Sequence, residues 1–371
     1  MGLSLPFVGC DLAESDPSDV GKVIIIGAGA AGMAAGYLLQ QRGVAFEILE
    51  ASSTYGGRMK RTTTFANFPI PLGAEWIHTD PSILQEIVND DSVNIDIQTT
   101  MYDPEVDYAL FEGEEYSIRD IGLAEDSKFI NATWFDFFEQ YILPPVADRI
   151  TYNAVVNAID YSAETIQVQT QNQTYSADSV IITVPVKLLQ NGAINFTPAL
   201  PDDKQGAIDN VTVWSGFKAF IEFSEKLWPV AVELAIEPES AGQKLYFDAS
   251  YGQNTNQQIL GLFAVGKGAL PYVQLGNADL IAYILNELDE LSDGMASSRY
   301  VKHIFQNWDA EPFAKGAYVY DHEDWRTVRR LGRNIDNRLF FAGTSYTTGD
   351  DWGSVHNATR SARRAVDELL S

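Results

Sequence analysis

Three glycines near the start of the chain have the spacing needed to bind the diphosphate of a dinucleotide. Gly27, Gly29 and Gly32 follow a short apolar run at residues 22–26. The first glycine permits a tight turn, the second lets a pyrophosphate approach the backbone, and the third lets the next helix pack against the strand. The unpaired N–H groups and the dipole at the start of that helix would then bind the diphosphate.

The segments around these glycines complete a dinucleotide-binding unit. Residues 33–42 favour a helix, and residues 44–49 form a second apolar run that ends on Glu50. In such a unit, the acid after the second strand accepts hydrogen bonds from ribose hydroxyls. A lone glycine pattern is weak evidence, but strand, turn, helix, strand and acid in this order predict a βαβ unit of the Rossmann type.

The overall composition excludes several classes of protein. The 371 residues are 46% hydrophobic and 12% aromatic, so the chain can bury a large core. A net charge of −26 disfavours nucleic acid as a partner and would attract a small cationic substrate. One cysteine and four scattered histidines predict no disulfide and no metal site. No apolar stretch approaches 18 residues, so we expect no transmembrane helix.

The first 20 residues have two interpretations. Residues 1–10 are apolar and end in Gly-Cys, and an acidic stretch follows, as in the tail of a bacterial lipoprotein export signal with a lipid anchor at Cys10. A disordered leader is an equally good interpretation, because no basic segment precedes the apolar run. The location therefore stays open between the cell envelope or periplasm and the cytoplasm.

The rest of the chain mixes helical and strand patterns. Strands are predicted over residues 165–170, 179–184, 216–223 and 338–341, and helices over residues 131–142, 280–291 and 354–370. This mixture predicts an α/β protein with an added antiparallel sheet. Alternation along 216–223 places Lys218 on the face opposite Phe217 and Ala219, which taken alone makes Lys218 a solvent-facing residue.

Five motifs together resemble the flavin-dependent amine oxidases, a family that includes monoamine, polyamine and L-amino-acid oxidases and histone demethylases. The resemblance covers most of the chain after residue 20. The motifs are the glycine-rich turn with Glu50, Gly56-Gly57-Arg58, Gly73-Ala74-Glu75-Trp76-Ile77-His78, Val156 to Ile159 with residues 178–185, and Leu339 to Thr344 with Gly353-Ser354-Val355-His356.

The resemblance implies FAD as the cofactor. The position that carries a flavin-linked cysteine in monoamine oxidases is Ala317 here, so FAD is expected to be non-covalent. The residues expected to bind it are Gly27, Gly29, Gly32, Glu50, Gly56, Gly57, Arg58, Gly73, Ala74, Glu75, Trp76, Val156, Gly343, Thr344 and Val355.

The implied fold class is α/β, with two interleaved domains. A Rossmann-type FAD-binding domain is expected over residues 21–79, 150–215 and 331–371. An α+β substrate domain with a mixed or antiparallel sheet is expected over residues 80–149 and 216–330, after a leader at residues 1–20. The substrate region is short for this family, so a second subunit of a homodimer is one way to complete its roof.

The resemblance also assigns catalytic residues. Lys218 matches the family lysine that holds a water against the reactive flavin nitrogen, and Tyr318 matches one wall of the aromatic cage around the amine. The second cage position is Ser354, so Trp352 is expected to substitute. His78, Ser354 and Asp350 are candidate substrate-binding residues.

These residues predict an FAD-dependent enzyme that oxidises a primary amine or polyamine to an imine and then an aldehyde, with dioxygen reduced to hydrogen peroxide. One alternative is a related FAD desaturase or dehydrogenase on a non-amine substrate. Another is an L-amino-acid oxidase, although Trp76 stands where that group carries a carboxylate-binding arginine. The third is a non-catalytic flavoprotein.

Overall fold

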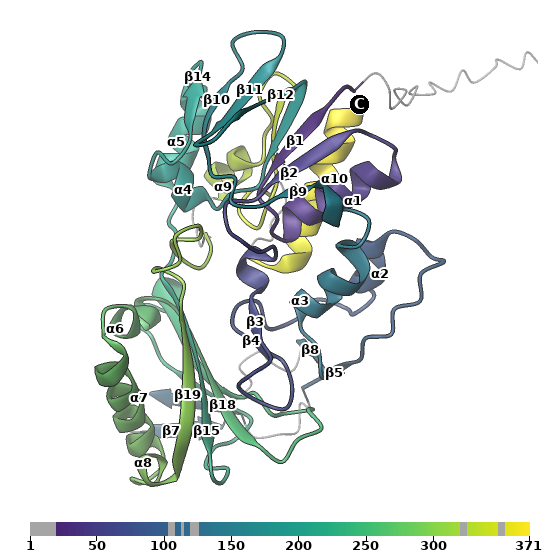
Figure 1. Ribbon diagram of the computed structural model, residues 1–371. Coiled ribbons are helices and arrows are strands. Elements are labelled where there is room, and N and C mark those ends of the chain that lie inside the picture. The colour runs from purple at the N-terminus through teal and green to yellow at the C-terminus, as the bar shows by residue number, and fades with distance from the viewer. Residues whose placement is uncertain (1–19, 103–107, 113–114, 119–125, 320–324, 348–352) are drawn as a thin grey trace, which may run out of the picture.

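The computed structural model describes residues 20–102, 108–112, 115–118, 126–319, 325–347 and 353–371. Figure 1 shows two bodies stacked end to end. The upper one holds the first and last segments of the described chain, and the lower one holds a large sheet. Cys10, Asp350 and Trp352 lie outside the described residues, as does the predicted leader at 1–20 except for Val20.

A five-stranded parallel sheet forms the centre of the upper body, in the order β20-β13-β1-β2-β9. Its strands are β1 (Val23–Ile26), β2 (Phe46–Leu49), β9 (Ile150–Thr151), β13 (Ser179–Ile182) and β20 (Leu339–Phe341). All four pairings are parallel. Strand β1 is apolar and buried throughout, and β2 and β13 contain one polar residue each, Glu47 and Ser179, as expected for a sheet that is covered on both faces.

Helices α1 (Ala30–Gln41) and α10 (Val355–Leu370) share one hydrophobic core on this sheet. The other face carries a four-stranded sheet of β10 (Val156–Asp160), β11 (Ile166–Thr170), β12 (Thr174–Ala177) and β14 (Asn195–Thr197). Helices α4 (Val186–Gln190), α5 (Asp202–Asn210) and α9 (Trp325–Leu331) belong to the same region. The βαβ unit predicted from the glycine-rich turn is confirmed.

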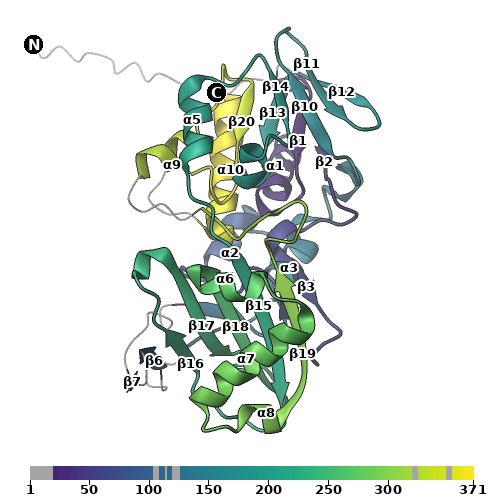
Figure 2. The ribbon, with the colours of Figure 1, turned by 90° about the vertical axis from the view of Figure 1, so that its left-hand side faces the viewer.

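The lower body is a seven-stranded sheet in the order β19-β15-β18-β17-β16-β6-β7. Its strands are β6 (Tyr108–Glu112), β7 (Glu115–Ile118), β15 (Gly216–Phe223), β16 (Ala231–Leu234), β17 (Gly242–Asp248), β18 (Gln258–Gly266) and β19 (Tyr300–Asn307). Strands β6 and β16 pair in parallel and the other pairs are antiparallel, so this sheet is mixed. Figure 2 shows α6 (Leu270–Val273), α7 (Asn277–Leu291) and α8 (Ala296–Arg299) across one face.

Strand β15 corrects one expectation from the sequence. Lys218 is only 2% exposed, so the solvent-facing interpretation of its strand face is wrong. Phe217 and Ala219 pack under the helices, while Phe220 on the opposite face packs in a second apolar cluster with Trp76. Both faces of the strand are buried, because a segment from the N-terminal half of the chain covers the side away from the helices.

That covering segment connects the two bodies. It contains 3₁₀ turns at Gly57–Met59 and Ala147–Arg149 and the elements β3 (Arg61–Thr62), β4 (Ile70–Pro71), α2 (Ile83–Val88), β5 (Thr99–Met101), β8 (Ser127–Phe129) and α3 (Trp134–Phe137). The helix expected over 131–142 begins only at Trp134, where Thr133 accepts the capping hydrogen bond from Asp136 N–H, and it continues as a π-helix over Phe138–Ile142. Short 3₁₀ turns at Glu239–Ala241 and Lys267–Ala269 complete the elements.

The predicted fold class, a Rossmann-type domain combined with a domain that carries a mixed sheet, is confirmed. The exact domain boundaries stay a prediction. Within the described ranges, no helix is both long and apolar enough to span a bilayer. No set of three potential metal ligands occurs in the same ranges.

Candidate functional site

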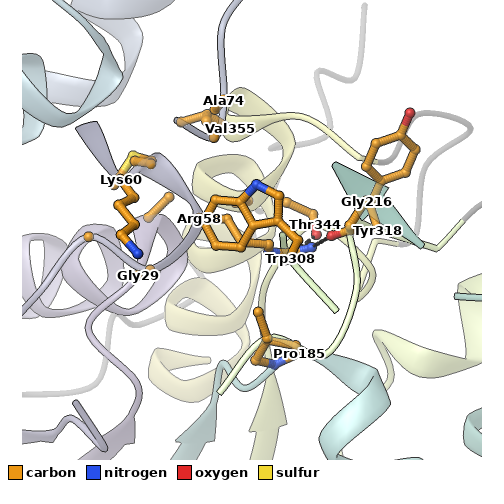
Figure 3. Close-up of a pocket in the computed structure, with 18 of the residues that line it drawn as sticks. Gly29, Arg58, Lys60, Ala74, Pro185, Gly216, Trp308, Tyr318, Thr344 and Val355 are labelled. Atoms are coloured by element: carbon orange, nitrogen blue, oxygen red, sulfur yellow. Dashed lines mark hydrogen bonds between the residues drawn. The ribbon is translucent and has the colours of Figure 1, made fainter. Parts of the chain in front are cut away.

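A cavity of about 830 Å³ runs between the two bodies, near the upper end of the range of roughly 300–1,000 Å³ for small-molecule sites. Its walls begin at the glycine-rich turn and Glu50 and continue to Lys218 and Tyr318 on the lower sheet. In Figure 3, Gly29 and Lys60 lie on one side of the Trp308 ring, and Gly216 and Tyr318 lie on the other. The cavity therefore joins the dinucleotide motif to the predicted catalytic residues.

The glycine-rich turn has the shape that a diphosphate requires. Gly27 has a φ of +105°, and a Cβ on Gly32 would lie 1.8 Å from the carbonyl oxygen of Gly27. A Cβ on Gly29 would meet no protein atom within 4 Å, so the space above it is open. Gly29 is also the N-cap of α1 and no side chain caps the helix, so the helix N-terminus is free to bind an anion.

Glu50 holds this turn from the other side. Its Oε2 accepts a hydrogen bond from Ala28 N–H at 2.6 Å, and its Oε1 accepts from the N–H and hydroxyl of Ser52 at 2.8 and 2.6 Å. A carboxylate has about four acceptor positions, so one remains for a ribose hydroxyl. Glu50 thus lines the cavity and also braces the turn.

The Gly-Gly-Arg motif lies against the glycine-rich turn. Gly56 adopts a φ of +104°, and its N–H donates to Ala28 O at 2.8 Å. Arg58 donates to Ala317 O and to the hydroxyl of Thr344, the latter at 2.8 Å (Figure 3). Burial lowers the pKa of Arg58 to about 10, so the guanidinium keeps its charge at neutral pH and supplies a cation to the cavity wall.

Lys218 lies at the far end of the cavity with three acceptors around its ammonium group. Its Nζ donates to Pro71 O at 2.9 Å, to Gly73 O at 3.1 Å and to Glu75 Oε2 at 2.7 Å. Burial lowers the pKa of Lys218, and the charge of Glu75 opposes that shift. The ammonium is thus held at a defined point of the wall, in an ion pair whose two side chains are 3% and 4% exposed.

Aromatic side chains form much of the adjoining wall. Tyr318 lies 6.0 Å from Trp214 between ring centroids, and Trp76 packs edge-on against Phe263 at 5.4 Å. The Trp308 indole is fixed by a hydrogen bond from its N–H to Leu72 O at 3.1 Å. Such rings give a rigid apolar surface that excludes water from a bound ligand.

The start of α10 closes another part of the cavity. Ser354 is the N-cap, and its hydroxyl accepts hydrogen bonds from Asn357 N–H and from the Asn357 side-chain amide, the latter at 2.8 Å. Val355 is the first residue of the helix, and both residues line the cavity. The partial positive charge of a 16-residue helix is therefore directed at the cavity. This capping role was not anticipated for Ser354.

Most of the residues predicted from sequence line the cavity, but two do not. Gly32 lies behind the turn, where it permits close packing, and Val156 is buried in the upper core while Ala154 reaches the cavity.

His78 lines the mouth of the cavity, where its Nδ1 lies 2.8 Å from Asp126 Oδ1. Gly343 has a φ of +146° and also lies on the wall. Asp350 and Trp352 lie outside the described residues.

Several residues of the wall were not predicted from the sequence. Asp126, Lys60 and Glu311 reach the cavity from loops and turns, and Gln243 and Leu245 reach it from β17. Lys60 and Glu311 form an ion pair of 2.7 Å. Alternation along β17 predicts that Gln243 and Leu245 share one face of the strand. No local pattern indicates which face of a strand lines a cavity.

The comparisons with known proteins decide the family. A family described as flavin containing amine oxidoreductase matches residues 138–370, and an NAD(P)-binding Rossmann-like domain matches residues 25–90. The chain belongs to the flavin-containing amine oxidoreductases. It is 24% identical to polyamine oxidase 2 of Arabidopsis thaliana, over 94% of this chain and 87% of that protein.

Two further similarities concern part of the sequence and the fold. The chain is 28% identical to lysine-specific histone demethylase 1 homolog 3 of Arabidopsis thaliana over 62% of its length, but it spans only 15% of that protein. Wild-type putrescine oxidase bound to putrescine superposes with a TM-score of 0.77 at 15% identity, over 94% of this chain and 99% of the other, which shows the shared fold.

Family membership indicates FAD as the cofactor, bound non-covalently as is the norm for the family, and makes the chain an FAD-dependent amine oxidoreductase. The cavity fits this cofactor. The space above Gly29 is open and the N-terminus of α1 has no side-chain cap. Glu50 and Arg58 add an acceptor and a cation to the wall, which are the kinds of group that a ribose and a diphosphate require.

Proposed function

We propose that this protein oxidises a primary amine or polyamine with FAD and dioxygen, and that it releases hydrogen peroxide. One observation carries the proposal: a single cavity joins the open N-terminus of α1 to a buried lysine and an aromatic wall. The match to polyamine oxidase 2 over 87% of that protein favours a polyamine oxidase over a demethylase, of which this chain covers a small part.

The upper body would hold the nucleotide end of FAD. Gly27 and Gly29 place backbone N–H groups and open space at the diphosphate, and Arg58 supplies a positive charge. Glu50 would accept a hydrogen bond from a ribose hydroxyl. The first residues of α10, Ser354 and Val355, would present a helix N-terminus to the flavin ring, where it favours negative charge.

The lower body would position the amine. When bound, FAD supplies a two-electron acceptor that takes a hydride from the carbon next to the amine nitrogen and passes the electrons to dioxygen. Tyr318, Trp76 and Phe263 exclude water, which favours the neutral amine that can give up the hydride. The ammonium group of Lys218 stabilises negative charge that develops beside it.

Acidic groups at the cavity favour a substrate with a second cationic end. Asp126 lies at the mouth beside His78, and the chain carries a net charge of −26. A distal ammonium group of a diamine or polyamine would be attracted by this field and would lie near Asp126. Trp76 offers no charge to a substrate carboxylate, which disfavours an amino-acid substrate.

The visible spectrum of the purified protein tests this proposal. We expect a yellow protein whose flavin bleaches within seconds when putrescine, spermine or benzylamine is added without oxygen. Readmission of air should restore the colour and produce one hydrogen peroxide per amine oxidised. A yellow protein that dithionite bleaches and no amine bleaches would contradict amine oxidation and support a non-catalytic flavoprotein.

A further inference from the structure

A second buried lysine lies behind the Glu75–Lys218 pair. Lys128, on β8, is 3% exposed, and its Nζ donates to Ala249 O at 2.9 Å. That carbonyl is its one protein acceptor among the described residues, although an ammonium group has three hydrogens. Transfer of a charged lysine from water to the protein interior costs on the order of several kcal/mol, so a compensating charge must lie nearby.

Glu75 lies between the two lysines. It lines the large cavity together with Lys218, and it also lines a second cavity together with Lys128. The second cavity holds about 10 Å³, which is enough for one water, and Thr133 and Gln253 add polar groups to its walls. The carboxylate of Glu75 bonds to Lys218 at 2.7 Å, and Glu75 shares the walls of the small polar cavity with Lys128.

The charges around Lys128 come from four segments of the chain. Glu75 and Asp248 attract its ammonium, and Lys218 repels it. Both oxygens of Asp248 are engaged, Oδ2 by Lys226 at 2.6 Å and Oδ1 by Ser250 N–H at 3.0 Å. Glu75 uses Oε2 for Lys218, and its Oε1 has no hydrogen-bond partner among the described residues, so this oxygen remains for Lys128. Tyr102 also faces Glu75 and Asp248, and burial raises its pKa well above its usual range, so it stays neutral.

We propose that Lys128 is a positioning residue for the flavin site, because it shares the carboxylate of Glu75 with Lys218 across a one-water cavity. Lys218, Glu75 and Lys128 form a row of three charged groups. In this row, Lys128 stabilises the position of the Glu75 carboxylate and adds a positive charge next to the Lys218–Glu75 pair at the flavin site. The inference rests on the proposed flavin site. It adds a residue that lies outside the large cavity.

The reduction potential of the bound flavin tests this proposal without any amine. Reduction adds negative charge to the flavin, so nearby positive charge raises the potential. The row Lys218, Glu75 and Lys128 carries a net charge of +1. Lys128→Met reduces this to 0 and should lower the potential, and Glu75→Gln raises it to +2 and should raise the potential. The double variant restores +1 and should return the potential toward that of the wild type.

The pH dependence of flavin reoxidation is the second readout. The rate of reoxidation should fall at high pH as Lys218 loses its proton, and this fall is the alkaline limb of the pH profile. Glu75→Gln removes the charge that supports the Lys218 ammonium and leaves the effect of burial unopposed. The pKa of Lys218 should therefore fall, and the alkaline limb should move to lower pH. Lys128→Met removes a neighbouring positive charge, so the alkaline limb should move to higher pH. Each shift of the alkaline limb should be about 1 pH unit, the low end of the pKa shifts that a nearby charge produces.

Matched variants separate this role from simple anchoring. Lys204 is a buried lysine of the upper body that donates to Leu331 O and Arg333 O at 2.6 Å each. Lys204→Met should lower stability and leave the potential and the alkaline limb unchanged. Lys128→Arg keeps the charge and should keep both values of the wild type. If Lys128→Met does not fold, Lys128→Gln and the double variant take its place.

Two results would overturn the inference. The first is a folded Lys128→Met or Lys128→Gln protein with lower thermal stability but the potential and alkaline limb of the wild type. The second is a pair of single variants, Lys128→Met and Glu75→Gln, whose potentials shift in the same direction, so that the double variant does not return toward the potential of the wild type. Because dithionite replaces the amine in these titrations, a protein that oxidises no amine still gives a clear answer.

Discussion

At the scale of single residues, the buried Lys218–Glu75 pair carries the first prediction. Lys218→Met leaves the Glu75 carboxylate buried without its 2.7 Å partner, so the apoprotein should lose about 3 kcal/mol of unfolding free energy. Flavin turnover should fall roughly 100-fold, because a positioned charge is lost. Urea unfolding of the apoprotein and stopped-flow reoxidation measure the two effects.

The control is the double variant Lys218→Met/Glu75→Gln, which should regain part of the stability but none of the turnover. Full turnover in either variant would show that Lys218 has no part in the mechanism.

Tyr318 carries the second prediction at this scale. Its ring lines the cavity beside Gly353, where a Cβ would lie 3.4 Å from the ring. Tyr318→Ala opens this wall, so kcat/KM for a small amine should fall about tenfold, as expected for the loss of one aromatic contact. Tyr318→Phe keeps the ring and should stay close to the wild type. An equal loss in both variants would assign the effect to the hydroxyl group.

At the scale of elements, the start of α1 gives a matched pair of glycine substitutions. A Cβ on Gly29 meets no protein atom within 4 Å, so Gly29→Ala should leave the apoprotein folded and stable. The methyl group would occupy the diphosphate space, so FAD affinity should fall at least tenfold.

The matched variant Gly32→Ala places a Cβ 1.8 Å from Gly27 O. It should lower the free energy of unfolding by about 1–3 kcal/mol and also lower FAD affinity. Urea unfolding and flavin fluorescence on reconstitution measure both; normal FAD binding by Gly29→Ala would place the diphosphate elsewhere.

The start of α10 provides a second prediction about an element. Ser354→Ala removes the side chain that caps the helix through Asn357, so stability should fall by about 1 kcal/mol. Ser354→Asp should restore the cap but should lower the flavin potential, because it puts a negative charge on the cavity wall. Thermal unfolding and reductive titration distinguish the two effects. A potential that is the same in both variants would separate this helix end from the flavin.

At the scale of the whole molecule, the charge of −26 predicts how the rate depends on salt. The field of an acidic protein attracts a dication more strongly than a monocation, and salt screens it. Between 10 mM and 0.5 M salt, kcat/KM should fall roughly tenfold for putrescine and much less for benzylamine. Steady-state peroxide assays measure this ratio. Equal salt dependence for the two amines would show that the acidic surface does not guide the substrate.

The nucleotide-binding half of the proposed site was predictable from local sequence patterns. Its strand, turn and helix are contiguous, so the backbone conformation that binds a diphosphate is encoded within residues 22–50. The Gly-Gly-Arg motif and the last helix were recognisable for the same reason, because each is a local element with its own residue pattern.

In the other half, the burial and the partners of Lys218 were not predictable from any local sequence pattern. Lys218 and Glu75 are 143 residues apart in the chain, and strand alternation alone made Lys218 a surface residue. It is buried because the segment that connects the two bodies covers the second face of β15, and the same packing brings Lys128 behind Glu75. Local periodicity tells which residues share a face, whereas the covering of that face depends on contacts between distant segments.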